Sequence, residues 1–173
     1  MALSSAEIAA ETSKHERQFI PGYKQRVRGL IDKSRAAGIV PVLITQPMLW
    51  GEGVDHVTGR DLAALRVEPK VPRYNGRLEW SVMEVYNEAM RTVGAESGVL
   101  VIDLAHSMPK SSRYFFDDLH YTAEGAAQVG AIVSKSLIPD LAWRFPEFAA
   151  GETTHSATPA TGNRPAAKRS RVL

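Results

Sequence analysis

The stretch Tyr114-Phe115-Phe116-Asp117-Asp118-Leu119-His120-Tyr121-Thr122-Ala123-Glu124-Gly125 places two acids and a histidine between aromatic residues and an apolar segment. Thr122 suits the N-cap of a helix, and Glu124 stands in the first turn, where the helix dipole favours negative charge. We expect this helix to run from 123 to about 138 and to stop at Pro139. Its apolar positions near one face are Ala127, Ile132, Val133 and Leu137. The stretch therefore places His120 on a loop just before a helix, where functional residues are common.

Asp117 and His120 are three residues apart, a spacing that has chemical meaning in a turn. The carboxylate can fold back onto one imidazole nitrogen, where it fixes the tautomer and stabilises the imidazolium. The other nitrogen is then left to act as a general base. The alternative is that Asp117 or Asp118 only caps a turn and that His120 is an exposed loop histidine. Short motifs often match by chance, so these residues taken alone favour the second interpretation.

Helical segments are expected on both sides of the first apolar run. Residues 4–18 are polar and permit a helix. A stronger helix is expected from Pro21, which suits a first turn, to Gly38. Its apolar positions are Tyr23, Val27, Leu30 and Ile31. A further helix is expected over 78–93, ended by Gly94.

Two short apolar runs have the character of buried strands. The first covers 39–45, with Pro41 at its beginning, and the second covers 99–104. An irregular excursion over 51–77 separates the first strand from the next helix. The alternation of helices and strands predicts right-handed crossovers and an α/β fold with a parallel sheet.

The chain resembles the C-terminal end of the SGNH (GDSL-type) hydrolases in its Asp-x-x-His block at 117–120 and in the Thr-x-x-Gly that opens the next helix. The resemblance covers about residues 20–140. It includes Val101-Ile102-Asp103-Leu104, Tyr86-Asn87-Glu88-Ala89 and Val40-Pro41-Val42-Leu43-Ile44-Thr45. It implies that Asp117 is the acid and His120 the base of a Ser-His-Asp triad that hydrolyses acyl esters. The implied substrates are small-molecule or carbohydrate esters, without a metal or organic cofactor.

The same resemblance implies a fold and a domain organisation. The fold would be a partial three-layer α/β/α structure, flavodoxin-like, with a short parallel sheet whose N-terminal strands are missing. Residues 1–149 would be the C-terminal part of this domain. Residues 150–173 are rich in Ala, Thr, Pro, Gly and Ser and are expected to form a flexible basic tail.

The nucleophile block of the family is missing from this sequence. No Gly-Asp-Ser occurs, and Asn75, Asn87 and Asn163 stand in the wrong order for the family's oxyanion block. We expect the missing blocks to lie upstream of Met1, through truncation, a split gene or a misplaced start. An incomplete sheet would also invite pairing with a complementing N-terminal part or with a second copy. Substitute nucleophiles would have to come from Ser4, Ser5, Ser111 or Ser112.

Two alternative functions are also considered. In the first, the chain would be a non-catalytic remnant that binds a partner or a carbohydrate through residues 46–77. In the second, it would be a metal-dependent hydrolase. The metal ligands would then be His106, Asp117, Asp118 and His120, although these have no established ligand spacing.

Composition excludes several classes of protein. The 173 residues contain no cysteine, which excludes disulfides and thiolate metal sites. The tail has four basic residues against one acid, a net of +3, so residues 1–149 carry −1 of the total +2. Because residues 1–149 are so close to neutral, we do not expect them to form a nucleic-acid-binding surface. No apolar run has the length of a membrane span and no secretory signal stands at the N-terminus, so the expected compartment is cytoplasmic only by default.

Overall fold

The computed structural model describes residues 3–66 and 75–149, and it is a mixed α/β structure that is mostly helical. Its helices are α1 (Ser5–Gln18), α2 (Ile20–Ala36), α3 (Gly76–Ser97), α4 (Leu104–Ser107), α5 (Ala123–Arg144) and α6 (Pro146–Ala149). The strands β1 (Val42–Ile44) and β2 (Leu100–Ile102) pair in parallel, from Val42 opposite Leu100 to Ile44 opposite Ile102. The α/β class and the parallel pairing expected from the sequence are confirmed.

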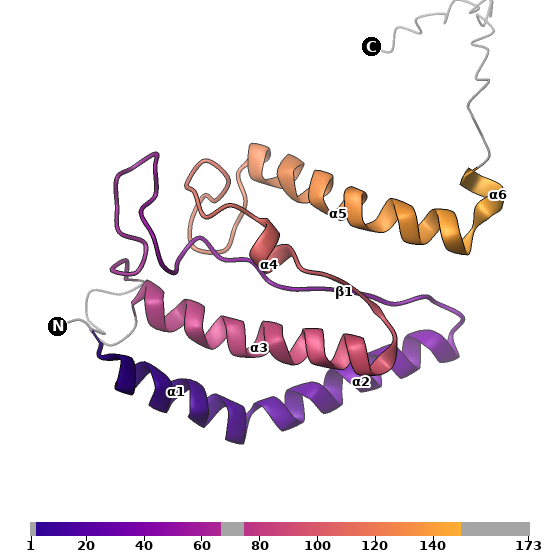
Figure 1. Ribbon diagram of the computed structural model, residues 1–173, viewed down its shortest axis with the longest axis horizontal. Coiled ribbons are helices and arrows are strands. Elements are labelled where there is room, and N and C mark those ends of the chain that lie inside the picture. The colour runs from indigo at the N-terminus through magenta and orange to yellow at the C-terminus, as the bar shows by residue number, and fades with distance from the viewer. Residues whose placement is uncertain (1–2, 67–74, 150–173) are drawn as a thin grey trace, which may run out of the picture.

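Helices lie on both sides of the two strands (Figure 1). α1 and α2 follow one another with a bend and run alongside α3 on one side, and α5 lies on the other. Both α3 and α5 contact β2. Val40, just before β1, and Ile44, at its end, remain 47% and 41% exposed. Within the described residues, β1 pairs only with β2, and apolar side chains at both of its ends are exposed to solvent. None of the described helices is both long and apolar enough to cross a membrane.

The buried apolar residues form two clusters. One cluster joins α2, α3 and the strands, and its buried members are Val27, Ile31, Val93 and Val99. The other lies among the segments that follow the strands, and its buried members are Met48, Leu49, Trp50, Leu62, Leu104, Met108 and Phe115. The loops at the carboxyl ends of the strands thus have a hydrophobic core of their own. Burial of these apolar side chains stabilises the loops without any contribution from the sheet.

The expected ends of α2 are confirmed. Pro21 stands in the first turn, where its missing N–H costs no helical hydrogen bond. The helix ends at Ala36, and Gly38 follows with a φ of +72°. A left-handed conformation of this kind is open to glycine at little cost, so the chain can turn there toward β1.

The prediction that Gly94 ends the next helix is wrong. α3 continues to Ser97, and Gly98, with a φ of +60°, is the residue that leaves the helix. Gly94 is buried where α3 approaches β2, and a Cβ at this position would overlap the Val101 side chain. Glycine at 94 therefore permits close packing of helix and strand.

The prediction that Pro139 stops the last long helix is also wrong, because α5 continues through it to Arg144. Proline removes the hydrogen bond to the carbonyl of Lys135, but Lys135 is exposed, so water can hydrate the freed group. An ion pair of 2.6 Å from Arg144 Nε to Asp140 Oδ2 spans the turn after the proline. α5 thus continues through a residue that usually ends a helix.

The strands are shorter than the runs 39–45 and 99–104 that predicted them, and Pro41 precedes β1 as expected. The irregular character of the excursion is confirmed for 51–66, and residues 67–74 lie outside the described residues.

The short helix α4 was not predicted. The tail at 150–173 also lies outside the described residues, so its predicted flexibility stays a prediction.

Candidate active site

The Asp117 carboxylate contacts both the ring and the main chain of His120. Asp117 Oδ1 accepts the N–H groups of His120 at 2.7 Å and Leu119 at 2.9 Å, and Oδ2 lies 2.8 Å from His120 Nδ1. The His120 N–H, followed by the Leu119 N–H and the ring, lowers the pKa of Asp117 from 3.8 to about 2. Asp117 is therefore ionised at neutral pH and can only accept, so His120 Nδ1 carries the proton.

The other ring nitrogen of His120 is open to solvent. The side chain is 80% exposed, and no hydrogen bond to Nε2 occurs within residues 3–66 and 75–149. A neutral imidazole that donates from Nδ1 keeps a lone pair on Nε2. The structure thus brings together the two predicted site residues, with one nitrogen oriented and the other available to take a proton.

The loop that carries this pair is pinned at both ends. Phe115 and Tyr121 form an antiparallel bridge, and the Phe116 N–H donates to the His120 carbonyl at 2.7 Å. Thr122 is the N-cap of α5, as expected, and its hydroxyl accepts from the Gly125 N–H at 3.0 Å. These contacts close the loop on either side of the Asp117–His120 pair.

Gly125 packs the first turn of α5 directly onto this loop. A Cβ at this position would overlap the main-chain carbonyl of Tyr114. The Thr122 N–H donates to the same carbonyl at 3.0 Å. Glycine is therefore required for the helix to begin so close to the loop.

The pair lies beside the segment that leaves β1. The Leu49 N–H donates to the Asp118 carbonyl at 2.9 Å, which joins the segment after β1 to the Asp117–His120 loop. Ligands bind at the carboxyl ends of parallel strands in open α/β sheets, so this is the edge at which chemistry is expected.

Asp55 ties the excursion after β1 to the loop after α4. Its side chain is 1% exposed and accepts the hydroxyls of Thr58 at 2.6 Å, Ser112 at 2.7 Å and Ser111 at 3.3 Å. Burial would raise the pKa of Asp55, but these donors and the Ser112 and Val57 N–H groups outweigh it and hold that pKa well below 3.8. Asp55 is thus a buried structural anchor that sequence reasoning did not identify.

The serines proposed as substitute nucleophiles have other roles. Ser111 and Ser112 donate to Asp55. Ser4 is the N-cap of α1, where its hydroxyl accepts from the Glu7 N–H at 3.2 Å, and Ser5 is the first residue of that helix. Among the residues that the structure describes, none of these hydroxyls is hydrogen-bonded to His120.

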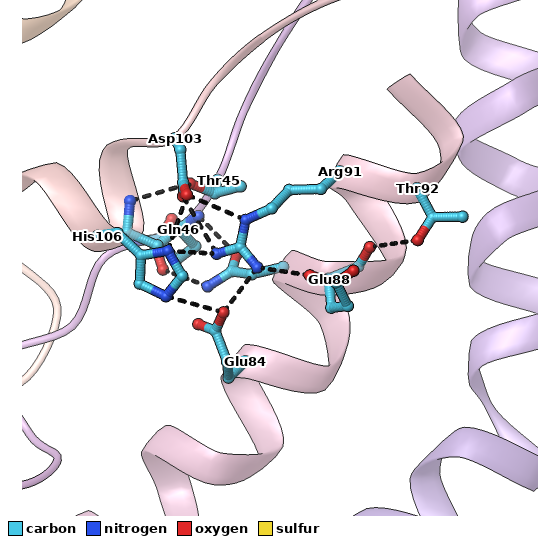
Figure 2. Close-up of polar contacts among 10 residues, drawn as sticks. Thr45, Gln46, Glu84, Glu88, Arg91, Thr92, Asp103 and His106 are labelled. Carbon is cyan, nitrogen blue, oxygen red and sulfur yellow. Dashed lines mark hydrogen bonds and ion pairs between the residues drawn. The ribbon is translucent and has the colours of Figure 1, made fainter. Parts of the chain in front are cut away.

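A second histidine belongs to an ion-pair network between α3 and α4 (Figure 2). His106 Nδ1 lies 2.8 Å from Asp103 Oδ2, and its Nε2 lies 3.1 Å from Glu84 Oε1. Arg91 lies between these acids, 3.1 Å from Asp103 Oδ1 and 2.6 Å from Glu84 Oε1. Burial would lower the pKa of Arg91, but the carboxylates of Glu84, Asp103 and Glu88 outweigh it and raise that pKa above 12.5. Because both nitrogens of His106 face carboxylates, this ring is a structural element of the network.

Thr45 joins the two strand ends next to this network. Its hydroxyl donates to Asp103 Oδ1 at 2.8 Å and accepts from the Ala105 N–H at 2.9 Å (Figure 2). Burial of Asp103 would raise its pKa, but hydrogen bonds from Arg91 and Thr45, with His106, lower it below 3.8. Sequence reasoning did not identify this pair, although Asp103 and His106 have the same spacing as Asp117 and His120.

The residues considered as metal ligands do not gather at one point. His106 pairs with Asp103 and Glu84, while His120 pairs with Asp117. Within the described parts of the chain, no three His, Cys, Asp or Glu side chains are grouped so as to hold a metal ion. This arrangement gives no support to the metal-dependent hydrolase.

Two surface cavities lie away from the Asp117–His120 pair. A cavity of about 260 Å³ lies at the amino ends of the strands, beside Gly38, Pro41 and Gly98. One of about 370 Å³ lies between α2 and α3, beside Ile20 and Val85. Neither is lined by residues 46–66, the described part of the segment proposed for partner binding.

Comparison of the chain with protein-family models, with curated proteins and with solved structures found no match.

Proposed function

We propose that this chain carries the acid–base part of an ester hydrolase of the SGNH type. The observation that carries the proposal is the state of His120: Nδ1 is held by an ionised carboxylate, and Nε2 is open to solvent. The loop that carries this ring is hydrogen-bonded to the segment that follows the carboxyl end of β1. A base with this orientation is what acyl transfer from a serine requires. Residues 1–149 would then form the C-terminal part of a flavodoxin-like α/β/α domain, with 150–173 as a tail.

In the proposed reaction the nucleophile is a serine outside this sequence. His120 Nε2 takes the serine proton while the serine oxygen attacks the ester carbonyl carbon. The imidazolium then returns that proton to the departing alcohol, and an acyl-enzyme forms. In the second half of the reaction, His120 Nε2 takes a proton from water while the water oxygen attacks the acyl carbon. The imidazolium then returns this proton to the serine oxygen, and the carboxylic acid leaves. Asp117 stays ionised throughout and stabilises the imidazolium, and no metal or organic cofactor is needed.

The source of the serine is a complementing N-terminal part of the enzyme. Supporting this, Val40 and Ile44 leave apolar surface beside β1 uncovered in the described residues, as the expected incomplete sheet would. Exposed apolar strands of this kind favour pairing with further chain. Self-association through β1 is the alternative way of covering this surface.

The test is complementation. The chain extended by the reading frame upstream of its first codon, and the isolated chain, are assayed with a short-chain aryl ester. We expect the isolated chain to be nearly inactive and the extended chain to be active. His120→Ala should abolish that activity, and His56→Ala, which changes an exposed loop histidine, should leave it intact. Activity of the extended chain that survives His120→Ala would refute the proposal.

A second candidate function is partner binding by the excursion after β1. Val54 and Val57 on this excursion are 52% and 63% exposed although the same segment is anchored by buried Asp55 and Leu62. An anchored loop that presents apolar side chains suits a binding surface. Carbohydrate or protein binding that is lost in Val57→Asp, kept in His120→Ala and accompanied by no ester turnover would favour this function.

A further inference from the structure

One peptide group connects Lys110 to the Asp117–His120 loop. The carbonyl of Met48 and the N–H of Leu49 belong to the same planar unit and point in opposite directions. Lys110 Nζ donates to that carbonyl at 2.8 Å, and the N–H donates to the Asp118 carbonyl at 2.9 Å. The orientation of this single unit therefore depends on the lysine at one end and determines the hydrogen bond at the other.

The Lys110 side chain is itself held from three directions. Its Nζ also donates to the Trp50 carbonyl at 2.5 Å and lies 3.4 Å above the centre of the Trp80 ring. Gly51, with a φ of +140°, leaves room for it, because a Cβ there would lie 3.0 Å from Lys110 Cε and 3.1 Å from Trp80 Cγ. Burial lowers the pKa of Lys110 to about 8, and the charge of Glu84 opposes that shift. A partly buried amine with two carbonyl acceptors and an aromatic face has little freedom to move.

We propose that Lys110 is a positioning residue for His120: by holding the Met48 carbonyl it aims the Leu49 N–H at Asp118 and so keeps the Asp117–His120 turn closed. This inference rests on the proposed function in that the residue which it positions is the proposed base. The Leu49 contact reaches the residue next to Asp117, whose carboxylate accepts the N–H groups of Leu119 and His120. Loss of the contact frees the middle of the turn, so the carboxylate loses donors and the ring loses its partner.

The experiment compares variants of the full chain by NMR. Lys110→Met keeps an unbranched side chain as far as the ε position and removes the charge and the donors, and Lys110→Arg keeps the charge and the donors. Lys135→Met, at an exposed position on α5, is the matched control. Two signals are read: the His120 Nδ1–H, assigned by its loss in His120→Ala, and the titration of the Asp117 carboxyl carbon. Circular dichroism checks the helices of each variant.

We expect Lys110→Met to lose the His120 Nδ1–H signal and to move the Asp117 midpoint from about 2 toward 3.8. Lys110→Arg should restore both signals, and Lys135→Met should leave both unchanged. A purely structural role would lower the unfolding midpoint and change neither signal. Both signals unchanged in a folded Lys110→Met would overturn the inference. If the methionine variant does not fold, Lys110→Leu, which also removes the charge and every donor, is judged by the same two signals.

These measurements separate the inference from the proposed function. They need neither an ester nor the complementing serine, so a chain without hydrolase activity still gives an answer. Ester turnover abolished by His120→Ala but unaffected by a Lys110→Met variant with normal signals would uphold the function and refute the positioning role. Signals altered by Lys110→Met, in a complemented chain without turnover, would uphold the positioning and refute the function.

Discussion

His106 lies 2.8 Å from Asp103, nitrogen Nδ1 to oxygen Oδ2, and so repeats the contact between His120 and Asp117. The two pairs have the same spacing in the sequence and the same atoms in contact. They differ at the second ring nitrogen, which faces Glu84 at 3.1 Å in His106 and solvent in His120. The surroundings of Nε2, and not the spacing, therefore distinguish a candidate base from a structural histidine.

This difference predicts opposite effects of the two histidine substitutions in a complemented, active chain. His120→Ala should lower kcat/KM by about 10³- to 10⁴-fold, since it removes the base. His106→Ala should leave kcat/KM within about twofold and cost less than about 1 kcal/mol of unfolding free energy, because its ion pairs are partly exposed. Ester kinetics and urea denaturation measure the two effects. An equal loss of activity in both variants would contradict the assignment.

The acid limb of the stability profile should contain a contribution from Asp117. The pKa of Asp117 is about 2 in the folded chain and 3.8 as an ordinary aspartate, so its carboxylate stabilises the fold above about pH 4. This contribution is lost as the pH falls from about 4 through 2. Carbon-detected NMR should give the midpoint directly. Asp117→Asn should flatten this part of the profile, and a wild-type midpoint near 3.8 would show that the turn is open in solution.

Lys110 should contribute to the alkaline side of the stability profile. Its folded pKa of about 8 lies below the ordinary 10.5, so between these values the unfolded chain binds the extra proton. Unfolding free energy from this group therefore rises as the pH increases from about 8 toward 10.5. NMR of the lysine Cε should show a midpoint near 8. The rise should be absent in Lys110→Met, and a lysine midpoint at 10.5 would contradict it.

Loss of the buried Asp55 carboxylate should lower the unfolding free energy more than loss of any exposed acid. Asp55→Ala leaves the donors of Thr58, Ser111 and Ser112 without their acceptor, and we expect a loss of about 2–4 kcal/mol. Asp32→Ala on the exposed face of α2 is the matched control and should cost about 0.5 kcal/mol or less. Equal unfolding midpoints for the two variants in urea would show that Asp55 is no anchor.

Two glycines of α5 form a matched pair. Gly125→Ala puts a methyl group against the Tyr114 carbonyl, which belongs to the main chain and cannot turn away, so it should cost more than about 2 kcal/mol. Gly130→Ala has open space and should stabilise the chain by about 0.5–1 kcal/mol through helix propensity. Thermal unfolding of both variants tests the pair, and a stabilised Gly125→Ala would show that α5 begins farther from the loop.

Features set by neighbouring residues were predictable from the sequence. The Thr122 cap, the turn at Gly38 and the helical periods depend on contacts within a few residues. The approach of Asp117 to His120 is equally local, because three residues of a turn bring the side chains together. Such features need no knowledge of the rest of the chain.

Features set by distant contacts were not predictable. Gly94 had the local character of a helix stop, and its packing against Val101 depends on how α3 crosses β2. Asp55 and Ser112 are 57 positions apart, so no spacing rule connects them. The partners of Lys110 are main-chain carbonyls, which leave no trace in the identities of the residues that carry them.

The hydroxyl of Thr45 has a consequence for strand alignment. Each strand contributes only three residues to the ladder, so the main chain alone gives weak resistance to sliding by one position. The Thr45 hydroxyl donates to Asp103 beyond the end of β2 and accepts from the Ala105 N–H. These two hydrogen bonds fix the segment after β1 to the segment after β2. In a Thr45→Val protein the shape is kept and the anchor is gone. Slippage, and not unfolding, is then how this sheet would fail.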